Sequence, residues 1–206
     1  MNIESQNNIL IIATFAIVVA IFFVTLITVI FLVSLFLKNQ AQYKRKNKLD
    51  SEVYQKKLSR FSDAMANALE RLSIEKIGAL IAVEKVDDIS SFKSTGYEIS
   101  GRFSPEFTIS IFSNKKSALH DGAMLISDFG MVAVSTYLPM TKNTTDVKYG
   151  ARHRAAIGMS ELNDSIVFVV SETNGNISYA SKGKIIVLPS KHRELVNEIR
   201  RSLSIR

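Results

Sequence analysis

The chain has 206 residues, a length that accommodates one globular domain and an additional segment. It has no cysteine, which excludes a disulfide framework and a thiolate metal site, and its formal net charge of +7 is unevenly distributed. Residues 1–37 hold one charged side chain, Glu4, and residues 38–60 hold eight basic and two acidic ones, which leaves residues 61–206 a net charge of +2. Because the larger part of the chain is nearly neutral, we do not expect a nucleic-acid-binding domain.

The first predicted element is a transmembrane helix over residues 9–37, preceded by an extracytoplasmic segment of residues 1–8. The run from 9 to 37 contains no charged side chain and exceeds the roughly 20 apolar residues that cross a bilayer. A signal peptide needs a basic start and a shorter apolar run, and a buried core helix of this length is uncommon. Basic side chains follow the run and none precedes it, so the positive-inside rule predicts a single-pass protein of the plasma membrane with its remaining chain in the cytoplasm.

Residues 38–57 form a basic juxtamembrane segment that we expect to be helical and to link the span to the domain. Its lysines and arginines are suited to anionic lipid headgroups, although a topology signal on a solvated face explains them equally well. Apolar residues recur every three to five positions from Leu49 to Leu72, which predicts one helix or two consecutive ones. Such a linker also leaves room for a regulatory partner in the membrane, which no motif identifies.

Residues 58–206 are predicted to form a cytoplasmic α/β domain with a mixed, largely antiparallel central sheet flanked by helices. Apolar or alternating runs predict strands at residues 77–85, 107–112, 122–127, 131–138, 165–171, 176–181 and 183–188. Short turns predict two hairpins, one around residues 128–130 and one around residues 174–175. Helices are expected at 150–163 and, with Ser190 as its N-cap, over the C-terminal tail. The loop 86–104 carries no clear signal.

The stretch "YGARHRAAIGMSE" (149–161) places two arginines and a histidine directly before small apolar residues. Charged side chains beside close-packed alanines and glycines are costly unless an anion meets them. If Arg152 or His153 begins a helix, its backbone N–H groups and its dipole add to the guanidinium groups of Arg152 and Arg154. Guanidinium matches phosphate oxygens two at a time. The stretch indicates a phosphate site, with an ordinary basic surface helix as an equally supported alternative.

A second feature is "ALHDGAMLIS" (118–127), in which Asp121 precedes two small residues and an apolar strand. A carboxylate at a strand end that a ligand can approach closely is suited to holding a divalent cation on substrate phosphates. A third feature is Glu172 in "VVSET", a carboxylate at another strand end. The alternatives are an Asp-Gly turn, which the second feature alone favours, and a turn or capping role for the glutamate.

Together these stretches resemble the diadenylate cyclase family over about residues 60–190. The matching pieces, in chain order, are "IGALI" (77–81), "LHDGA" (119–123), "YLP" (137–139), "RHRAA" (152–156), "GMSE" (158–161) and "VVSE" (169–172). The Asp-Gly-Ala and Arg-His-Arg motifs in this order and spacing are specific as a pair, whereas either alone is weak. One span ahead of the domain is similar to the single-span membrane-anchored members of the family.

The resemblance implies an enzyme that converts two ATP into cyclic di-AMP and two pyrophosphates, each 3′-OH attacking the α-phosphate of the other ATP. The product has two equivalent bonds, so the expected partner is a second copy of the chain, facing the first across a two-fold axis. Two other functions stay open: a catalytically silent membrane-bound receptor for adenine nucleotides with the same fold, and a membrane scaffold. The retained Asp121 and the complete Arg-His-Arg motif favour the enzyme.

The resemblance also implies roles for individual residues. Asp121 would bind a metal near the attacking 3′-OH. The residues that would hold the phosphates are Arg152, His153 and Arg154. The residues that would contact ATP elsewhere are Leu80, Gly122, Ala123, Tyr137, Ala151 and Ser171, with Tyr137 stacking on adenine. The candidate metal ligands besides Asp121 are Glu172 and His120.

If His120 and Asp121 lie in extended chain, their side chains point to opposite faces, so His120 ranks lower as a metal ligand. The metal would be Mg²⁺, Mn²⁺ or Co²⁺, among which the sequence does not choose. Ala151 stands where many relatives have threonine, so one hydroxyl donor to phosphate is missing from this chain. The backbone N–H at that position remains.

Overall fold

The computed structural model describes residues 25, 26, 28, 31–36, 50–142 and 149–204 of the chain. Contacts divide the chain into two compact units, residues 1–53 and 54–206. The predicted span over 9–37 and the basic segment over 38–57 lie largely outside the described residues, and the described part of the span is helical. Within the described part of the chain, no helix is both long and apolar enough to cross a bilayer.

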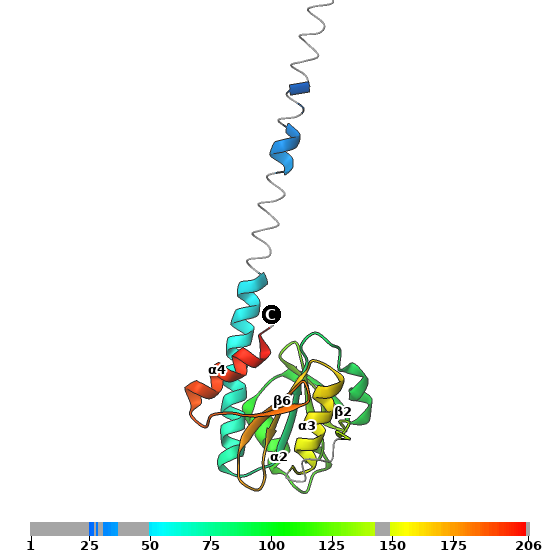
Figure 1. Cartoon of the computed structure of the whole chain (residues 1–206), viewed down its shortest axis with the longest axis vertical. Helices are drawn as coiled ribbons and strands as arrows, with labels where there is room; N and C mark the ends of the chain where they lie inside the picture. The colour runs from blue at the N-terminus through cyan, green and yellow to red at the C-terminus, as the bar shows by residue number, and fades with distance from the viewer. Residues whose placement is uncertain (1–24, 27, 29–30, 37–49, 143–148, 205–206) are drawn as a thin grey trace, which may run out of the picture. The chain divides into compact units, whose positions relative to one another are not determined.

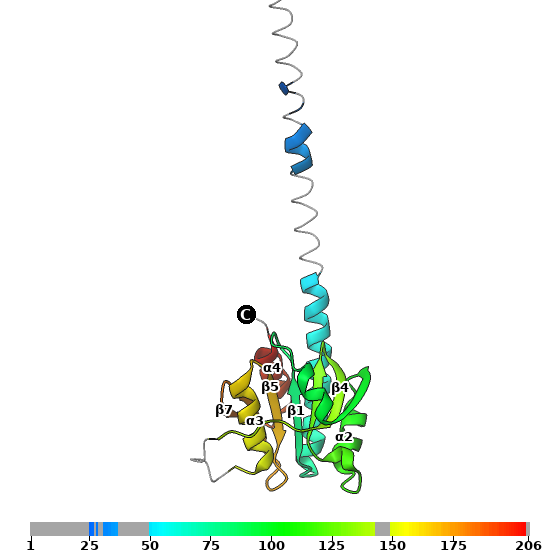
Figure 2. The same ribbon diagram turned by 90° about the vertical axis from the view of Figure 1, so that its right-hand side faces the viewer.

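The second unit is built around a seven-stranded sheet with the strand order β2-β4-β3-β1-β5-β6-β7 (Figures 1 and 2). The strands are β1 (Ala79–Val83), β2 (Tyr97–Arg102), β3 (Ala123–Ser127), β4 (Gly130–Thr136), β5 (Ile166–Val170), β6 (Ile177–Ser181) and β7 (Lys184–Val187). β1 and β3 run parallel, and the other neighbouring pairs are antiparallel. The prediction of a mixed, largely antiparallel sheet is confirmed.

Helices cover both faces of this sheet, so alternate side chains of the central strands belong to different cores. On one face, Ile81 of β1 packs in a core shared with the helix over residues 54–74 and with α4 (His192–Leu203). On the other face, its neighbour Leu80 packs in a core shared with α3 (Ala151–Leu162). Figure 1 shows α4 and α3 on opposite sides of the sheet. A strand buried on both faces is expected to be a continuous apolar run, as "ALIAV" is.

The strand directions bring most of the candidate site residues to one edge of the sheet, the one where β1 and β3 begin and β4 and β5 end. β3 is parallel to β1, so the residues that precede them, Gly122 and Gly78, lie at the same edge. β5 is antiparallel to β1 and ends at this edge before Ser171, and β4 is antiparallel to β3 and ends there before Tyr137. Neighbouring strands are about 4.8 Å apart, so the β3 and β5 ends, separated by β1, lie roughly 10 Å from each other.

The segment predicted as a strand over 107–112 is instead a helix, α2 (Pro105–Ser113). The N-cap Ser104 accepts a hydrogen bond from the N–H of Phe107, a proline follows it, and Glu106 lies at the positive end of the helix dipole. The prediction is wrong because these capping interactions decide the local structure, whereas an alternation of six residues is too short to do so.

Two further parts of the domain differ from expectation. The loop 86–104, which carries no clear signal, holds a 3-10 helix, η1 (Ser90–Thr95), and the edge strand β2. The side chains of β2 are mostly exposed on both of its faces, so no alternation of apolar residues marks it. The C-terminal helix is confirmed as α4, but its N-cap is Lys191 rather than Ser190, and no side chain caps it.

Candidate active site

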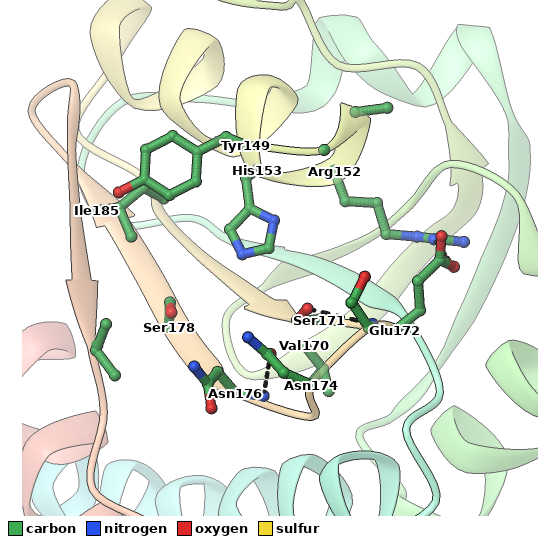
Figure 3. Close-up of a pocket in the computed structure, with 14 residues that line it drawn as sticks. Tyr149, Arg152, His153, Val170, Ser171, Glu172, Asn174, Asn176, Ser178 and Ile185 are labelled. Carbon is green, nitrogen blue, oxygen red and sulfur yellow. Dashed lines mark hydrogen bonds and ion pairs between the residues drawn. The ribbon is translucent and has the colours of Figure 1, made fainter. Parts of the chain in front are cut away.

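Helix α3 begins at one wall of a cavity of about 410 Å³ (Figure 3). Gly150 is the N-cap and provides no side-chain hydrogen bond, so the backbone N–H groups of the first turn have no side-chain cap. Ala151, Arg152 and His153 line this cavity, which we call the Arg152 pocket, whereas Arg154 is exposed and is not among its lining residues. Successive helical residues turn by about 100°, so one helix does not direct all three basic side chains into one cavity.

The opposite wall of the Arg152 pocket is the end of β5 and the turn that follows it. Ser171 lines the pocket, and its hydroxyl oxygen accepts a hydrogen bond from the N–H of Thr173 at 3.3 Å. Gly175, at a φ of 77°, closes the turn by donating its N–H to the carbonyl oxygen of Ser171 at 2.9 Å. The hairpin predicted around residues 174–175 is thus confirmed, and its turn holds Ser171 against the start of α3.

An ion pair joins the two walls at the rim of the pocket (Figure 3). Nη1 of Arg152 donates to Oε2 of Glu172 at 2.8 Å. The Arg152 side chain is 24% exposed and that of Glu172 is 63% exposed, so solvent screens the pair and its contribution to stability is about 0–1 kcal/mol. The contact therefore matters for the direction of the guanidinium group more than for the stability of the fold. It occupies one of five N–H donors, which leaves the group able to bind an anion.

His153 lies inside the pocket and stacks on Tyr149, with ring centroids 5.5 Å apart and an interplanar angle of 16°. Burial lowers the pKa of His153 below its usual value, because a partly desolvated imidazole disfavours its charged form. The histidine is therefore neutral at neutral pH and offers a ring N–H to an anion, while the positive charge of this wall comes from Arg152.

Asp121 lies in a different cavity, a groove of about 590 Å³ that we call the Asp121 groove. The lining residues of the groove and of the Arg152 pocket do not overlap. Asp121 is exposed, and its Oδ1 accepts a hydrogen bond from the N–H of Gly122 at 3.1 Å. Gly122 has a φ of 88°, and a Cβ there would lie 2.7 Å from the carbonyl carbon of Ser135, so glycine alone fits. Tyr137, 71% exposed, lines the same groove.

His120 lines the Asp121 groove together with Asp121. The condition for the lower rank of His120, an extended chain, is not met, because His120 ends a 3-10 helix, η2 (Ala118–His120). Its Nδ1 lies 2.6 Å from the carbonyl oxygen of Ser117, so Nδ1 carries the proton and Nε2 keeps its lone pair. In the described parts of the chain, no group of three or more His, Cys, Asp or Glu side chains is arranged to hold a metal ion.

The remaining predicted nucleotide contacts are buried. Leu80 is 3% exposed and Ala123 is fully buried, and neither lines the pocket or the groove. Both belong to the core beneath α3, where Ala155 and Ala156 pack on the sheet. Gly158 gives room to another part of the chain, since a Cβ there would collide with the backbone of residues 139–141, which cross the helix.

A family model described as DisA bacterial checkpoint controller nucleotide-binding (DAC) matches residues 66–185. The chain is also 49% identical over 144 residues to the diadenylate cyclase of Mycoplasma genitalium, an alignment that covers 70% of this chain and 72% of the relative. The chain belongs to the diadenylate cyclase family. The diadenylate cyclase of Mycoplasma pneumoniae is similarly related, at 47% identity over 71% of this chain and 72% of the relative. Diadenylate cyclases are ATP-using nucleotidyltransferases, so the protein is an enzyme of that class.

Solved structures share the fold of this diadenylate cyclase. DacA from Staphylococcus aureus, determined as a double mutant, superposes with a TM-score of 0.62 at 30% identity over 75% of this chain and 97% of that one. A hypothetical membrane spanning protein from Bacillus cereus superposes with a TM-score of 0.59 at 37% identity, over 62% and 63% of the two chains. The mixed sheet with helices on both faces is thus the fold of this family.

Sequence reasoning missed several residues that line the two cavities of this diadenylate cyclase. In the Arg152 pocket they are Tyr149, Asn174, Asn176 and Ser178. In the Asp121 groove they are Thr95, Tyr97, Lys115 and Lys116. Tyr149 precedes the N-cap Gly150 and lies outside the helix, so helical spacing does not predict its stacking on His153. The others lie on loops and strand ends whose meeting depends on the register of the sheet.

Proposed function

We propose that this protein is a membrane-anchored diadenylate cyclase that condenses two ATP into cyclic di-AMP and two pyrophosphates between two face-to-face subunits. The observation that carries the proposal is the division of the site within one subunit. The Arg152 pocket and the Asp121 groove lie along one edge of the sheet but share no lining residue. A two-fold axis past this edge would set the groove of each subunit against the pocket of the other.

The Arg152 pocket has the donors that a triphosphate requires. The uncapped N-terminus of α3 offers backbone N–H groups and the positive end of a helix dipole. The guanidinium of Arg152, the imidazole of His153 and the hydroxyl of Ser171 add side-chain donors from both walls. Arg154 is exposed outside the pocket, and we propose that it contacts the phosphates only once the second subunit or the substrate is in place.

The reaction then needs positioning and charge neutralisation more than covalent participation by the protein. The 3′-OH of one ATP loses its proton, its oxygen bonds to the α-phosphorus of the other ATP, and the bond to the β-phosphate breaks to release pyrophosphate. Asp121 would hold the attacking ribose from one subunit, while Arg152 and His153 of the other would hold the triphosphate and stabilise charge on the leaving group. The same event at the second half-site closes the ring.

A divalent cation fits the Asp121 groove by the chemistry of its donors. Asp121 provides carboxylate oxygens, and His120, whose Nδ1 bonds to the carbonyl oxygen of Ser117, lines the same groove. Mg²⁺ prefers oxygen ligands, whereas Mn²⁺ and Co²⁺ also accept an imidazole, so a nitrogen ligand favours the latter two. Bound there, the cation would lower the pKa of the 3′-OH and neutralise phosphate charge. Glu172, whose Oε2 accepts from Arg152, stays a predicted ligand rather than a proposed one.

The membrane anchor rests on the sequence of the first unit. Residues 9–37 carry no charge, and basic residues follow them. Two hydroxyls of the described part, those of Thr28 and Ser34, donate to carbonyl oxygens three residues earlier, which satisfies them without water. We expect the protein to fractionate with membranes, to need detergent for extraction, and to expose its C-terminal unit to protease only from the cytoplasmic side.

The decisive experiment incubates the full-length protein, in detergent or vesicles, with ATP and Mn²⁺, and measures the product by mass spectrometry. We expect cyclic di-AMP and two pyrophosphates per molecule of product. Bound ATP without product in Mg²⁺, Mn²⁺ and Co²⁺ would identify a silent nucleotide receptor instead. A protein that binds no adenine nucleotide would leave the scaffold as the remaining function.

A further inference from the structure

Gly78, the residue immediately before β1, lies directly beneath the guanidinium group of Arg152. A Cβ added at this position would be 2.6 Å from Nη1 of Arg152, 3.1 Å from its Cζ, and 3.0 Å from Oε2 of Glu172. Its φ lies outside the positive region, so the backbone conformation does not require a glycine. Glycine at position 78 therefore leaves room for the ion pair between Arg152 and Glu172.

Three segments that are distant in the sequence converge at this point. Ala79 is opposite Val170 in the antiparallel pair of β1 and β5, so the residues just outside the two strands are neighbours at the sheet edge. Glu172 comes from the β5 side, Gly78 from the β1 side, and Arg152 from the first turn of α3. Together the bare backbone and the carboxylate leave the Arg152 guanidinium one position at the rim of its pocket.

We propose that Gly78 and Glu172 are positioning residues that hold the Arg152 guanidinium in the direction needed for the triphosphate. This inference rests on the proposed function, in which Arg152 binds the phosphates. A long arginine side chain has many rotamers, and one that is held before the substrate arrives loses less conformational entropy when it binds. Glu172 uses one N–H of the guanidinium and leaves the other donors available to a phosphate.

The test is Gly78→Ala in the full-length protein. The obstructed atom is the far end of a flexible side chain, so the methyl group would displace the guanidinium without disturbing the fold. We expect an unchanged melting temperature, and a kcat/KM for ATP that falls roughly ten- to a hundredfold, as for the loss of one hydrogen bond to a charged group. Gly101→Ala is the matched control, because a Cβ there meets its nearest atom, Cε of Met131, at an ordinary 3.5 Å.

A double-mutant cycle separates positioning from a general structural effect. In an Arg152→Ala background no guanidinium remains to be displaced, so Gly78→Ala should cause no further loss. Additive losses, or full activity and ATP affinity in Gly78→Ala alone, would overturn the inference. A wild-type protein that makes no cyclic di-AMP would contradict the proposed function instead, and the cycle would then be measured on the dissociation constant for ATP.

Glu172→Gln provides a second variant that leaves the space at Gly78 unchanged. A positioning role predicts a lower kcat in this variant, and predicts that the loss disappears when Arg152 is alanine. The concentration of Mn²⁺ that gives half-maximal activity should stay as in the wild type. An increase in that concentration would show that Glu172 is a metal ligand and would overturn its role in holding Arg152.

Discussion

The Arg152 pocket and the Asp121 groove lie on the same sheet edge but differ in how completely each is formed. In the pocket, the start of α3 and the β5–β6 hairpin face each other, an ion pair of 2.8 Å joins them, and a stacked tyrosine covers the histidine. In the groove, Asp121 is exposed and accepts a hydrogen bond only from the N–H of the next residue among the interactions seen here.

The difference indicates that the two cavities have different roles, one in binding the nucleotide and one in the chemical step. A cavity with two walls, backbone donors and a held guanidinium is able to bind the phosphates of a nucleotide within one subunit. The groove is more open, and besides its carboxylate and imidazole it is lined by Tyr137 and two lysines, so we expect it to act on a nucleotide whose phosphates the facing pocket holds. The predictions below test whether binding and chemistry separate in this way.

The largest effect is expected for Asp121→Asn. The substitution removes the carboxylate charge that would hold the cation and the ribose, so product formation should fall by at least about a hundredfold, while ATP affinity stays largely intact. Product is measured by chromatography and ATP binding by calorimetry. Asp128→Asn is the control, since Asp128 is an exposed carboxylate at the far end of the same β3–β4 hairpin, paired with Lys57 at 2.8 Å. Full turnover in Asp121→Asn would refute the metal assignment.

Mixed dimers test whether the Arg152 pocket of one subunit and the Asp121 groove of the other act on the same phosphodiester bond. Consider a dimer of one Asp121→Asn subunit and one Arg152→Ala subunit. If each half-site combines the groove of one subunit with the pocket of the other, one half-site keeps both residues and the other loses both. The mixture should therefore form one bond and accumulate the linear dinucleotide rather than cyclic di-AMP, which mass spectrometry distinguishes. Each variant alone is the control and should form both products far more slowly than the mixture forms the linear one. If the mixture forms nothing while both variants still dimerise, Asp121 and Arg152 of the same subunit act on one bond.

A smaller effect is expected for Ala151→Thr at the start of α3. Ala151 is exposed at the first helical position and lines the Arg152 pocket, so a hydroxyl there can donate to a phosphate. A hydrogen bond to a charged group is worth about 1.5–3 kcal/mol, so activity should be maintained or rise by roughly tenfold. Ala151→Val has nearly the same shape without the hydroxyl and should show no gain. A large loss in Ala151→Thr would show that the site needs a small residue.

The smallest effect is a pH dependence that comes from His153. Burial lowers the pKa of His153 in the folded protein below its ordinary value of 6.5. When the pH falls below 6.5, the unfolded chain therefore binds a proton at this histidine more readily than the folded protein does. The free energy of unfolding contributed by this group is therefore present above that pH and is lost as the pH falls. Thermal unfolding without nucleotide should show a smaller decrease towards acid pH in His153→Gln than in the wild type. Their difference at pH 8, where histidine is neutral in both states, is the baseline, and equal acid slopes would contradict the assignment.

Local patterns predicted much of the domain correctly. The apolar run around residues 79–83, the two hairpins and the C-terminal helix each follow from signals within a dozen residues. The same reasoning failed at residues 107–112, where the capping residues just upstream carried the stronger signal. The strand β2 was not predicted, because an exposed edge strand lacks the alternation of apolar and polar residues that marks a strand with one buried face.

The candidate site shows the same division between local and distant signals. The helix start at Ala151 and the carboxylate of Asp121 ahead of β3 were predictable, since helix boundaries and strand ends depend on neighbouring residues. The position of His120 was not predictable, because His120 ends a 3-10 turn and does not lie in an extended chain. The contact of Gly78 with Arg152 joins residues 74 positions apart, and no local pattern predicts it.

By itself, the sequence determined which chemical groups this protein has and which short segments carry them. Backbone propensity, capping and hydrophobic alternation act over a few residues, so a linear pattern records them. Only the tertiary structure decided that those groups form two cavities, a pocket with two facing walls and an open groove, and that the bare backbone of Gly78 lies next to the Arg152 guanidinium. These arrangements depend on strand order and register, which arise from packing between residues far apart in the chain.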